Sequence, residues 1–171
     1  ASTERKIKQF NIIMNIETTL DIASKKLKKF NIKTSQIDSE ILLADTIKKD
    51  RKYIILNLKD EIKKPLLNKF NNLINRRAKG EPVAYLTGKK EFWNETFYIN
   101  KNVLIPRPDT EIIIESVLAM FPKKSKLQML DIGTGSGCIL LSILKERPNF
   151  YGTGIDISKN SIDVCKYNTQ L

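Results

Sequence analysis

Apolar residues recur at helical spacing in the first half of the chain. Five of them follow one another at steps of four, three, four and three: Ile16, Leu20, Ala23, Leu27 and Phe30. This spacing predicts an amphipathic helix. A second helix is expected over about 36–48 with Ser35 as N-cap candidate, a third behind Asp50, and a fourth that Pro65 opens and that ends near Gly80. The pattern therefore predicts a small helical bundle.

The pattern changes after Gly80. Aromatic and β-branched runs, broken by Asn-Lys-Asn and by prolines, predict a β-hairpin in which residues 92–98 pair with residues 101–105. We interpret Phe92 and Trp93 as packing residues of this hairpin, because aromatic side chains are natural cross-strand partners.

The rest of the chain alternates between strand and helix signals. A helix is expected from Asp109 or Thr110 to Phe121, where Pro122 stops it. Then come a strand over 127–132, a glycine loop, a helix over 137–146, a strand over 151–155 and a helix over 158–168. This order is typical of the start of a doubly wound α/β sheet.

Composition narrows the function classes. No run of the 171 residues approaches the roughly 20 apolar residues of a membrane span, and the first residues lack the features of a secretory signal, so we expect a cytoplasmic protein. The absence of histidine excludes His-ligated metals and Ser-His or Cys-His catalysis within these residues. No metal site is expected. Cys138 and Cys165 have no CxxC spacing and are expected to be reduced and buried.

The net charge of +11 is unevenly distributed. Residues 1–80 hold 19 Lys and Arg against 9 Asp and Glu, whereas residues 81–171 hold 11 against 10. Two interpretations stay open: lysine-rich, solvated helix faces, or a surface that binds a partner. The excess of 24 Lys over 6 Arg fits a general lysine bias better than an arginine-rich recognition surface.

The segment LDIGTGSG gives the clearest indication of a ligand-binding site. Gly133, Gly135 and Gly137 stand between a predicted strand and helix, where a ligand can lie against the backbone N–H groups. Their spacing differs from the G-x-G-x-x-G of dinucleotide sites. Asp131 would repel a diphosphate but could accept from an ammonium group, and Asp156 ends the next strand, where a carboxylate can bind ribose hydroxyls. These features together favour S-adenosylmethionine.

Several segments carry a family resemblance: RRAKGEPVAYLTGKKEFW, LIPRPDTE, LDIGTGSG and the ID that contains Asp156. Together they resemble the HemK/PrmC family, the glutamine N5-methyltransferases of peptide chain release factors. The resemblance implies an α/β chain with an N-terminal helical bundle, a β-hairpin linker and the beginning of a Rossmann-like class I methyltransferase domain. We expect a helical substrate-recognition domain over 1–80, the linker over 81–106 and the incomplete methyltransferase domain over 107–171.

The resemblance also implies an activity and a site. The activity is S-adenosylmethionine-dependent methylation of the glutamine in the Gly-Gly-Gln motif of release factors. Asp156 would hold the ribose, Asp131 would position the amino group, and Arg107 would belong to a lid beside the cofactor, shared with Pro108, Thr110 and Glu111. A rigid crossover is the alternative for this last segment. The wall against the methionine part would consist of Gly133, Thr134, Gly135, Ser136 and Gly137.

The family's catalytic motif, Asn-Pro-Pro-Tyr, does not occur in these residues. In the family its asparagine side chain and an adjacent carbonyl orient the planar acceptor amide. We therefore assign no catalytic residue, interpret the 171 residues as part of the enzyme, and expect them to transfer no methyl group alone.

Two other functions remain open. One is an adenine N6-methyltransferase that acts on DNA or RNA, although GEPVAYLTG and PRPDTE favour the release factor enzymes. The other is a non-catalytic basic binding module. The expected partners are release factors, with no membrane and no direct nucleic-acid binding.

Overall fold

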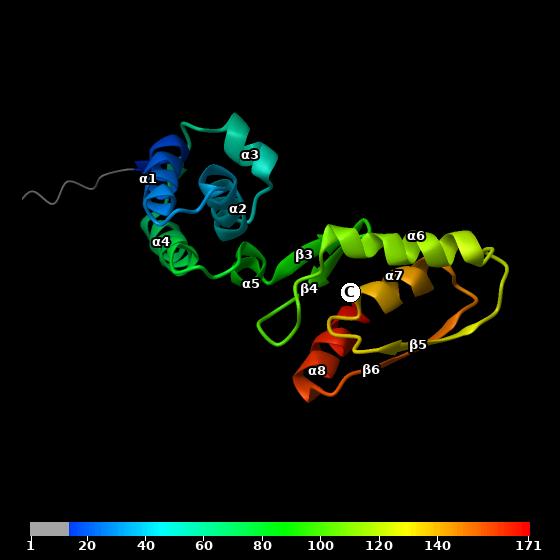
Figure 1. The fold of residues 1–171 in the computed structure, drawn as a ribbon. Helices are drawn as coiled ribbons and strands as arrows, with labels where there is room; N and C mark the ends of the chain where they lie inside the picture. Colours follow the sequence, from blue (N-terminus) through cyan, green and yellow to red (C-terminus); the bar gives the residue numbers. More distant parts are fainter. Residues whose placement is uncertain (1–13) are drawn as a thin grey trace, which may run out of the picture. The chain divides into compact units, whose positions relative to one another are not determined.

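The computed structural model describes residues 14–171, which form two compact units. The boundary between them lies between Leu86 and Thr87, and Figure 1 shows the elements of each. Residues 1–13, which fall within the helical domain expected over 1–80, lie outside the described residues. The expected linker over 81–106 is divided between the two units.

The first unit contains the predicted helices: α1 (Ile16–Lys29), α2 (Ser35–Ile47), α3 (Arg51–Leu56) and α4 (Lys64–Ala78). The carboxylate of Asp50 caps α3 by accepting from the amide of Tyr53 at 2.6 Å. The prediction for Ser35 is wrong by one position, because Thr34 occupies the N-cap and Ser35 is the first helical residue. Two short strands that sequence did not indicate, β1 (Met14–Asn15) and β2 (Glu61–Ile62), pair antiparallel.

The four helices enclose one hydrophobic core. α2 contacts α1, α3 and α4. The side chains of Leu27, Leu42, Leu43, Ile54 and Phe70 are completely buried. At the edge of this core, Arg77 of α4 donates to the carboxylate of Asp38 of α2 at 2.7 Å. The first unit is therefore a closed helical bundle.

The hairpin differs from the prediction. α5 (Val83–Thr87) precedes β3 (Lys89–Phe92), which pairs antiparallel with β4 (Glu95–Tyr98). The predicted pairing of 92–98 with 101–105 is thus wrong. The two residues between β3 and β4, Trp93 and Asn94, have φ angles of 49° and 58°. A two-residue hairpin turn requires this left-handed backbone, and Trp-Asn is not one of the sequence pairs that signal it.

The remaining elements follow the predicted α/β order. A 3-10 turn, η1 (Pro108–Thr110), leads into α6 (Glu111–Met120). After it come β5 (Gln128–Ile132), α7 (Cys138–Glu146), β6 (Tyr151–Ile155) and α8 (Lys159–Asn168). β5 and β6 are parallel, with Gln128 opposite Tyr151 and Ile132 opposite Ile155. Figure 1 shows α7 between α6 and this sheet, and α7 contacts both α6 and β6. The mixed α/β fold is confirmed.

The two faces of the β5–β6 sheet differ. On one face α7 lies so close that a Cβ atom at Gly152 would come within 2.7 Å of the side chains of Leu140 and Leu144. On the other face Leu130, Ile132 and Ile155 are exposed by 57%, 76% and 45%. Among residues 14–171 no helix is long and apolar enough to cross a membrane.

Candidate functional site

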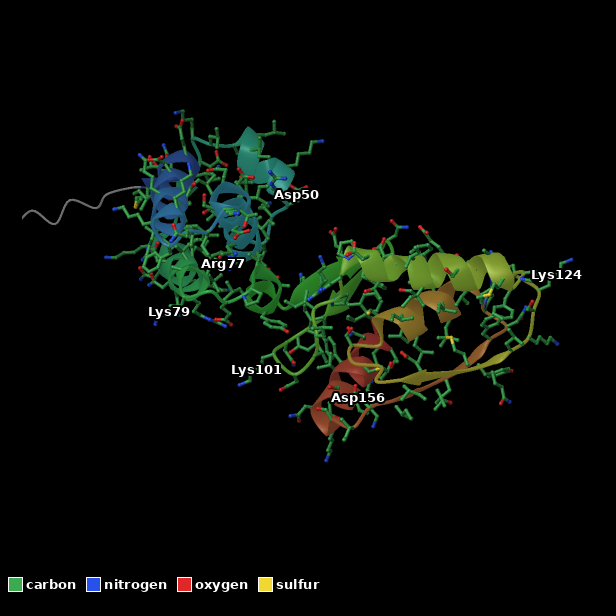
Figure 2. The ribbon with its side chains drawn as sticks, in the orientation of Figure 1. Asp50, Arg77, Lys79, Lys101, Lys124 and Asp156 are labelled. Carbon is green, nitrogen blue, oxygen red and sulfur yellow. The ribbon has the colours of Figure 1, made fainter. Side chains whose placement is uncertain are left out.

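The candidate site lies at the carboxyl ends of β5 and β6. Because the two strands are parallel and in register, Asp131 of β5 and Asp156 directly after β6 lie at the same end of the sheet. The glycine loop, residues 133–137, starts at this end and leads into α7. Figure 2 labels Asp156 beside the start of α8. The structure therefore brings together the loop and the two carboxylates that the sequence predicted as a site.

All three glycines of the loop have left-handed backbone, with φ angles of 81° at Gly133, 56° at Gly135 and 80° at Gly137. A Cβ atom would meet nothing within 4 Å at Gly133, and only a carbonyl oxygen at 4.0 Å at Gly135. At Gly137 it would come within 2.7 Å of the Sγ atom of Cys165. The first two glycines thus border open space, and the third permits close packing of the loop on α8.

The loop directs four of its amides into the protein. The amides of Gly133 and Thr134 donate to the carbonyl of Ile155 at 2.8 and 3.0 Å, and the amide of Gly137 donates to the carbonyl of Thr134 at 2.8 Å. The amide of Gly135 donates to Asp156 at 3.0 Å. These four amides therefore have acceptors within the protein. The expectation that a ligand lies against N–H groups at the helix N-terminus stays a prediction for the first amides of α7.

Asp156 bonds the glycine loop with one carboxylate oxygen and the start of α8 with the other. Its Oδ2 accepts from the amide of Gly135, and its Oδ1 accepts from the amide of Ser158 at 2.8 Å. These bonds, that from Ser158 first, hold the pKa of Asp156 below its ordinary value. Since each carboxylate oxygen can accept more than one hydrogen bond, Asp156 keeps acceptor capacity for hydroxyl groups of a ligand.

Two polar atoms of the site have no partner among residues 14–171. The Oδ2 atom of Asp131 and the Oγ1 atom of Thr134 are buried and make no hydrogen bond within the described part of the chain. A buried carboxylate oxygen without a donor is costly, and an ammonium group of a ligand would satisfy it. Cys138 and Cys165 lie nearby, and burial raises the pKa of both thiols, which agrees with the expected inert cysteines. Together, the open space at two glycines and the two carboxylates fit a ligand with an amino group and a ribose.

The PRPDTE segment is only partly connected to other elements. Arg107 is exposed, and its side chain makes no hydrogen bond or ion pair that the structure shows between residues 14 and 171. Glu111 accepts from the backbone amide of Trp93 at 3.0 Å, and the indole N–H of Trp93 donates to Glu146 at 3.1 Å. Glu111 therefore holds the hairpin turn, which favours the crossover interpretation over the lid for this residue.

Sequence reasoning missed two residues that support the site. Glu146 accepts from Trp93 at the hairpin turn, and Asn168 bonds the carbonyl of Ser136 in the glycine loop. Neither stands in a recognisable spacing, because each acts across more than 30 positions of the chain. A single sequence offers no signal for such contacts.

Two family models match the chain in the order that the motifs indicated. Residues 18–88 match the PrmC N-terminal domain, and residues 123–171 match a methyltransferase domain. The second unit thus carries a methyltransferase domain, whose Rossmann-like class I fold agrees with the parallel β5–β6 pair. This match implies S-adenosylmethionine as the methyl donor.

Named relatives agree with these matches and confirm the resemblance to the HemK/PrmC family. A release factor glutamine methyltransferase of Buchnera aphidicola subsp. Baizongia pistaciae is 40% identical over 92% of this chain and 57% of its own length. One of Caulobacter vibrioides is 39% identical over 85% of this chain and 50% of its own. A bifunctional methyltransferase of Rickettsia conorii is 35% identical over 90% of this chain and 34% of its own. The chain thus spans between about a third and somewhat over half the length of these relatives.

Proposed function

We propose that this chain forms the substrate-recognition and cofactor-binding part of an S-adenosylmethionine-dependent enzyme that methylates the glutamine of the Gly-Gly-Gln motif in peptide chain release factors. The observation that carries this proposal is the buried, unpartnered Oδ2 of Asp131 at the end of the sheet from which the glycine loop starts. The reaction and the substrate are those of the relatives that are release factor glutamine methyltransferases.

Each residue of the site has a proposed role. Asp131 accepts from the amino group of the cofactor, and Asp156 accepts from its ribose hydroxyls while it holds the amide of Gly135. The wall against the methionine part consists of Gly133, Thr134, Gly135, Ser136 and Gly137. Arg107, directly before η1, belongs to a lid beside the cofactor. The bound cofactor supplies a sulfonium methyl group, which the acceptor nitrogen takes by in-line displacement.

The two parts of the chain have different proposed roles in binding the release factor and the cofactor. We assign recognition of the release factor to the helical part, expected over 1–80, and cofactor binding to the methyltransferase part over 107–171. The hairpin, within the connector over 81–106, joins them. The helical part carries nearly all of the excess positive charge, and its described polar residues form no cluster of three potential metal ligands. With release factors as its substrates, the protein is proposed to work in the cytoplasm.

Calorimetry of S-adenosylmethionine with the purified chain tests the cofactor site. Asp156→Ala should weaken binding tenfold to a hundredfold, because charge-assisted hydrogen bonds to the ribose are lost and the amide of Gly135 loses its acceptor. The matched control is Asp163→Ala, which removes an exposed carboxylate from α8. Equal affinity of wild-type protein and Asp156→Ala would remove Asp156 from the site.

A radiolabelled-methyl assay with protein from the complete gene tests the reaction. We expect label on a release factor and none on the same factor with the Gly-Gly-Gln glutamine changed to alanine. Label on DNA or RNA instead would favour the adenine methyltransferase. Salt-dependent RNA binding without any cofactor binding would favour the basic binding module.

A further inference from the structure

The inner face of α8 carries a buried amide that connects two other elements. The Oδ1 atom of Asn168 accepts from the backbone amide of Tyr98 in β4 at 2.8 Å. Its Nδ2 atom donates to the carbonyl of Tyr98 at 3.0 Å and to the carbonyl of Ser136 in the glycine loop at 2.8 Å. Asn168 is only 8% exposed. One side chain thus bonds both the hairpin and the loop.

These three bonds occupy both N–H donors of the Asn168 side-chain amide and give its oxygen one donor. A carboxamide offers two N–H donors and one oxygen, and here each donor has a carbonyl and the oxygen has an N–H. The opposite orientation of the amide would place the oxygen against two carbonyls, so the contacts define its orientation. No other uncharged side chain of similar size supplies this combination of groups.

The packing around Asn168 leaves the loop little freedom. Gly137 approaches Cys165 of α8 so closely that a Cβ atom at Gly137 would overlap with its sulfur. One turn earlier in α8, Ser161 donates to the carbonyl of Asn102, in the segment after the hairpin, at 3.0 Å. α8 therefore supports the glycine loop and holds the exit of the hairpin with the same face.

The hairpin is also fastened at its other end. Its turn is held by the bonds from Trp93 to Glu111 and Glu146, and Glu95 of β4 forms an ion pair with Lys145 of α7. A hairpin fixed at both ends moves as one piece with the elements that hold it. A displacement of β4 thus moves Tyr98, its last residue, and is transmitted through Asn168 to the loop.

We propose, on the basis of the function proposed above, that Asn168 is a positioning residue that couples the hairpin to the cofactor loop. It holds Ser136 in the conformation that binds the cofactor, and it makes the order of β4 depend on whether that loop is occupied. Because such coupling is reciprocal, a cofactor in the loop stabilises β4, and a partner that orders β4 strengthens cofactor binding.

The test compares Asn168→Ala with Asn160→Ala, which removes an exposed amide from the same helix. In the chain without cofactor, hydrogen exchange of residues 133–137 should become at least roughly tenfold faster in Asn168→Ala and stay unchanged in Asn160→Ala. The affinity for S-adenosylmethionine should fall roughly tenfold in the first variant only. Unchanged exchange and unchanged affinity in Asn168→Ala would overturn the proposal.

A second measurement on the wild-type chain serves if Asn168→Ala does not fold. Saturation with S-adenosylmethionine should slow exchange of the Tyr98 amide, which bonds Asn168, more than that of the Ile99 amide, which bonds the carbonyl of Gly88. Equal slowing of both amides, or none in a chain that binds the cofactor, would contradict the coupling. A wild-type chain that binds no cofactor contradicts the proposed function instead, while the exchange of the unliganded variants still tests the positioning role.

Discussion

The two units bury their apolar side chains to different extents. The helical unit collects them in one core, in which Leu27, Leu43 and Phe70 are completely buried. The methyltransferase unit leaves Leu130 and Ile132 exposed on one face of its sheet. The helical unit therefore encloses its core within itself, whereas one face of the β5–β6 sheet is left uncovered by the described residues of the second unit.

Arg147 illustrates how the second unit is held together. This arginine is 9% exposed, and its guanidinium donates to the carbonyls of Phe121 and Leu118 at 2.8 and 2.7 Å, at the end of α6. It thereby satisfies carbonyl groups that a helix end leaves without a partner, and it fastens α6 to the end of α7. Asn168 and Glu146 do comparable work at the hairpin.

The largest expected effect separates packing in the two units. Leu43→Ala should destabilise the helical unit by about 2–5 kcal/mol, because it opens a cavity in a closed core. Ile132→Ala should change the stability of the second unit by less than about 0.5 kcal/mol, because this side chain is 76% exposed. Hydrogen exchange of α1 to α4 measures the stability of the helical unit. The fluorescence of Trp93, the one tryptophan of the chain, measures that of the second unit.

Equal losses in these two variants would break the comparison. A large effect of Ile132→Ala would mean that its face is covered in solution, for example by self-association. Measurements at several protein concentrations distinguish that case, since association makes stability depend on concentration.

The helices were predictable because their spacing repeats over many residues. The stripe from Ile16 to Leu27 and the cap at Asp50 lie where the pattern indicated, whereas Phe30, the last residue of the predicted stripe, follows α1 and is 55% exposed. A hairpin was predicted too, but its pairing was not, because its turn at Trp93 and Asn94 is stabilised by distant residues that no local pattern reveals, Glu111 and Glu146.

The sequence was sufficient to predict which residues gather at the site, but not how their backbone groups are oriented. The glycines and the acids Asp131 and Asp156 gather at one end of the sheet because loop and strand ends are local features. The direction of the loop amides was not predictable, since it depends on the carbonyl of Ile155 in the neighbouring strand. The same holds for Asn168, whose partners lie 32 and 70 positions away.

The next effect concerns the ion pair in the helical unit. Asp38 and Arg77 have side chains that are 8% and 17% exposed, and Asp38 also accepts from the hydroxyl of Thr34 at 2.9 Å. Asp38→Ala should cost about 3 kcal/mol, because it leaves the arginine charge without its partner in a dry environment. The exposed pair of Lys25 and Asp21 is the matched control, and Asp21→Ala should cost less than about 0.5 kcal/mol.

Urea unfolding followed by helical circular dichroism measures both variants. Similar small costs for Asp38→Ala and Asp21→Ala would show that water reaches Arg77, and that packing alone stabilises this unit. Figure 2 labels Arg77 within the helical unit.

The smallest effect concerns the charge of the helical unit. Lys25 pairs with Asp21 and Lys26 bonds Asn75, whereas Lys28, Lys29 and Lys33 form no ion pair with the described residues. If these three lysines attract an acidic surface of a release factor, they act on the rate of association, and salt screens them over a Debye length of about 8 Å. Replacing all three by glutamate should therefore slow association several-fold at low salt and much less at high salt.

A matched reversal in the other unit sharpens this last comparison. Lys123, Lys124 and Lys126 are exposed between α6 and β5, so changing them to glutamate alters the net charge equally at another place. Stopped-flow association with an intact release factor should slow mainly when the lysines near the end of α1 are reversed, while S-adenosylmethionine affinity stays unchanged in both variants. Equal slowing by both reversals would mean that net charge alone attracts the partner. No slowing by either would leave these lysines as a solvated helix face, and the positive charge of the helical unit would then play no part in recognition.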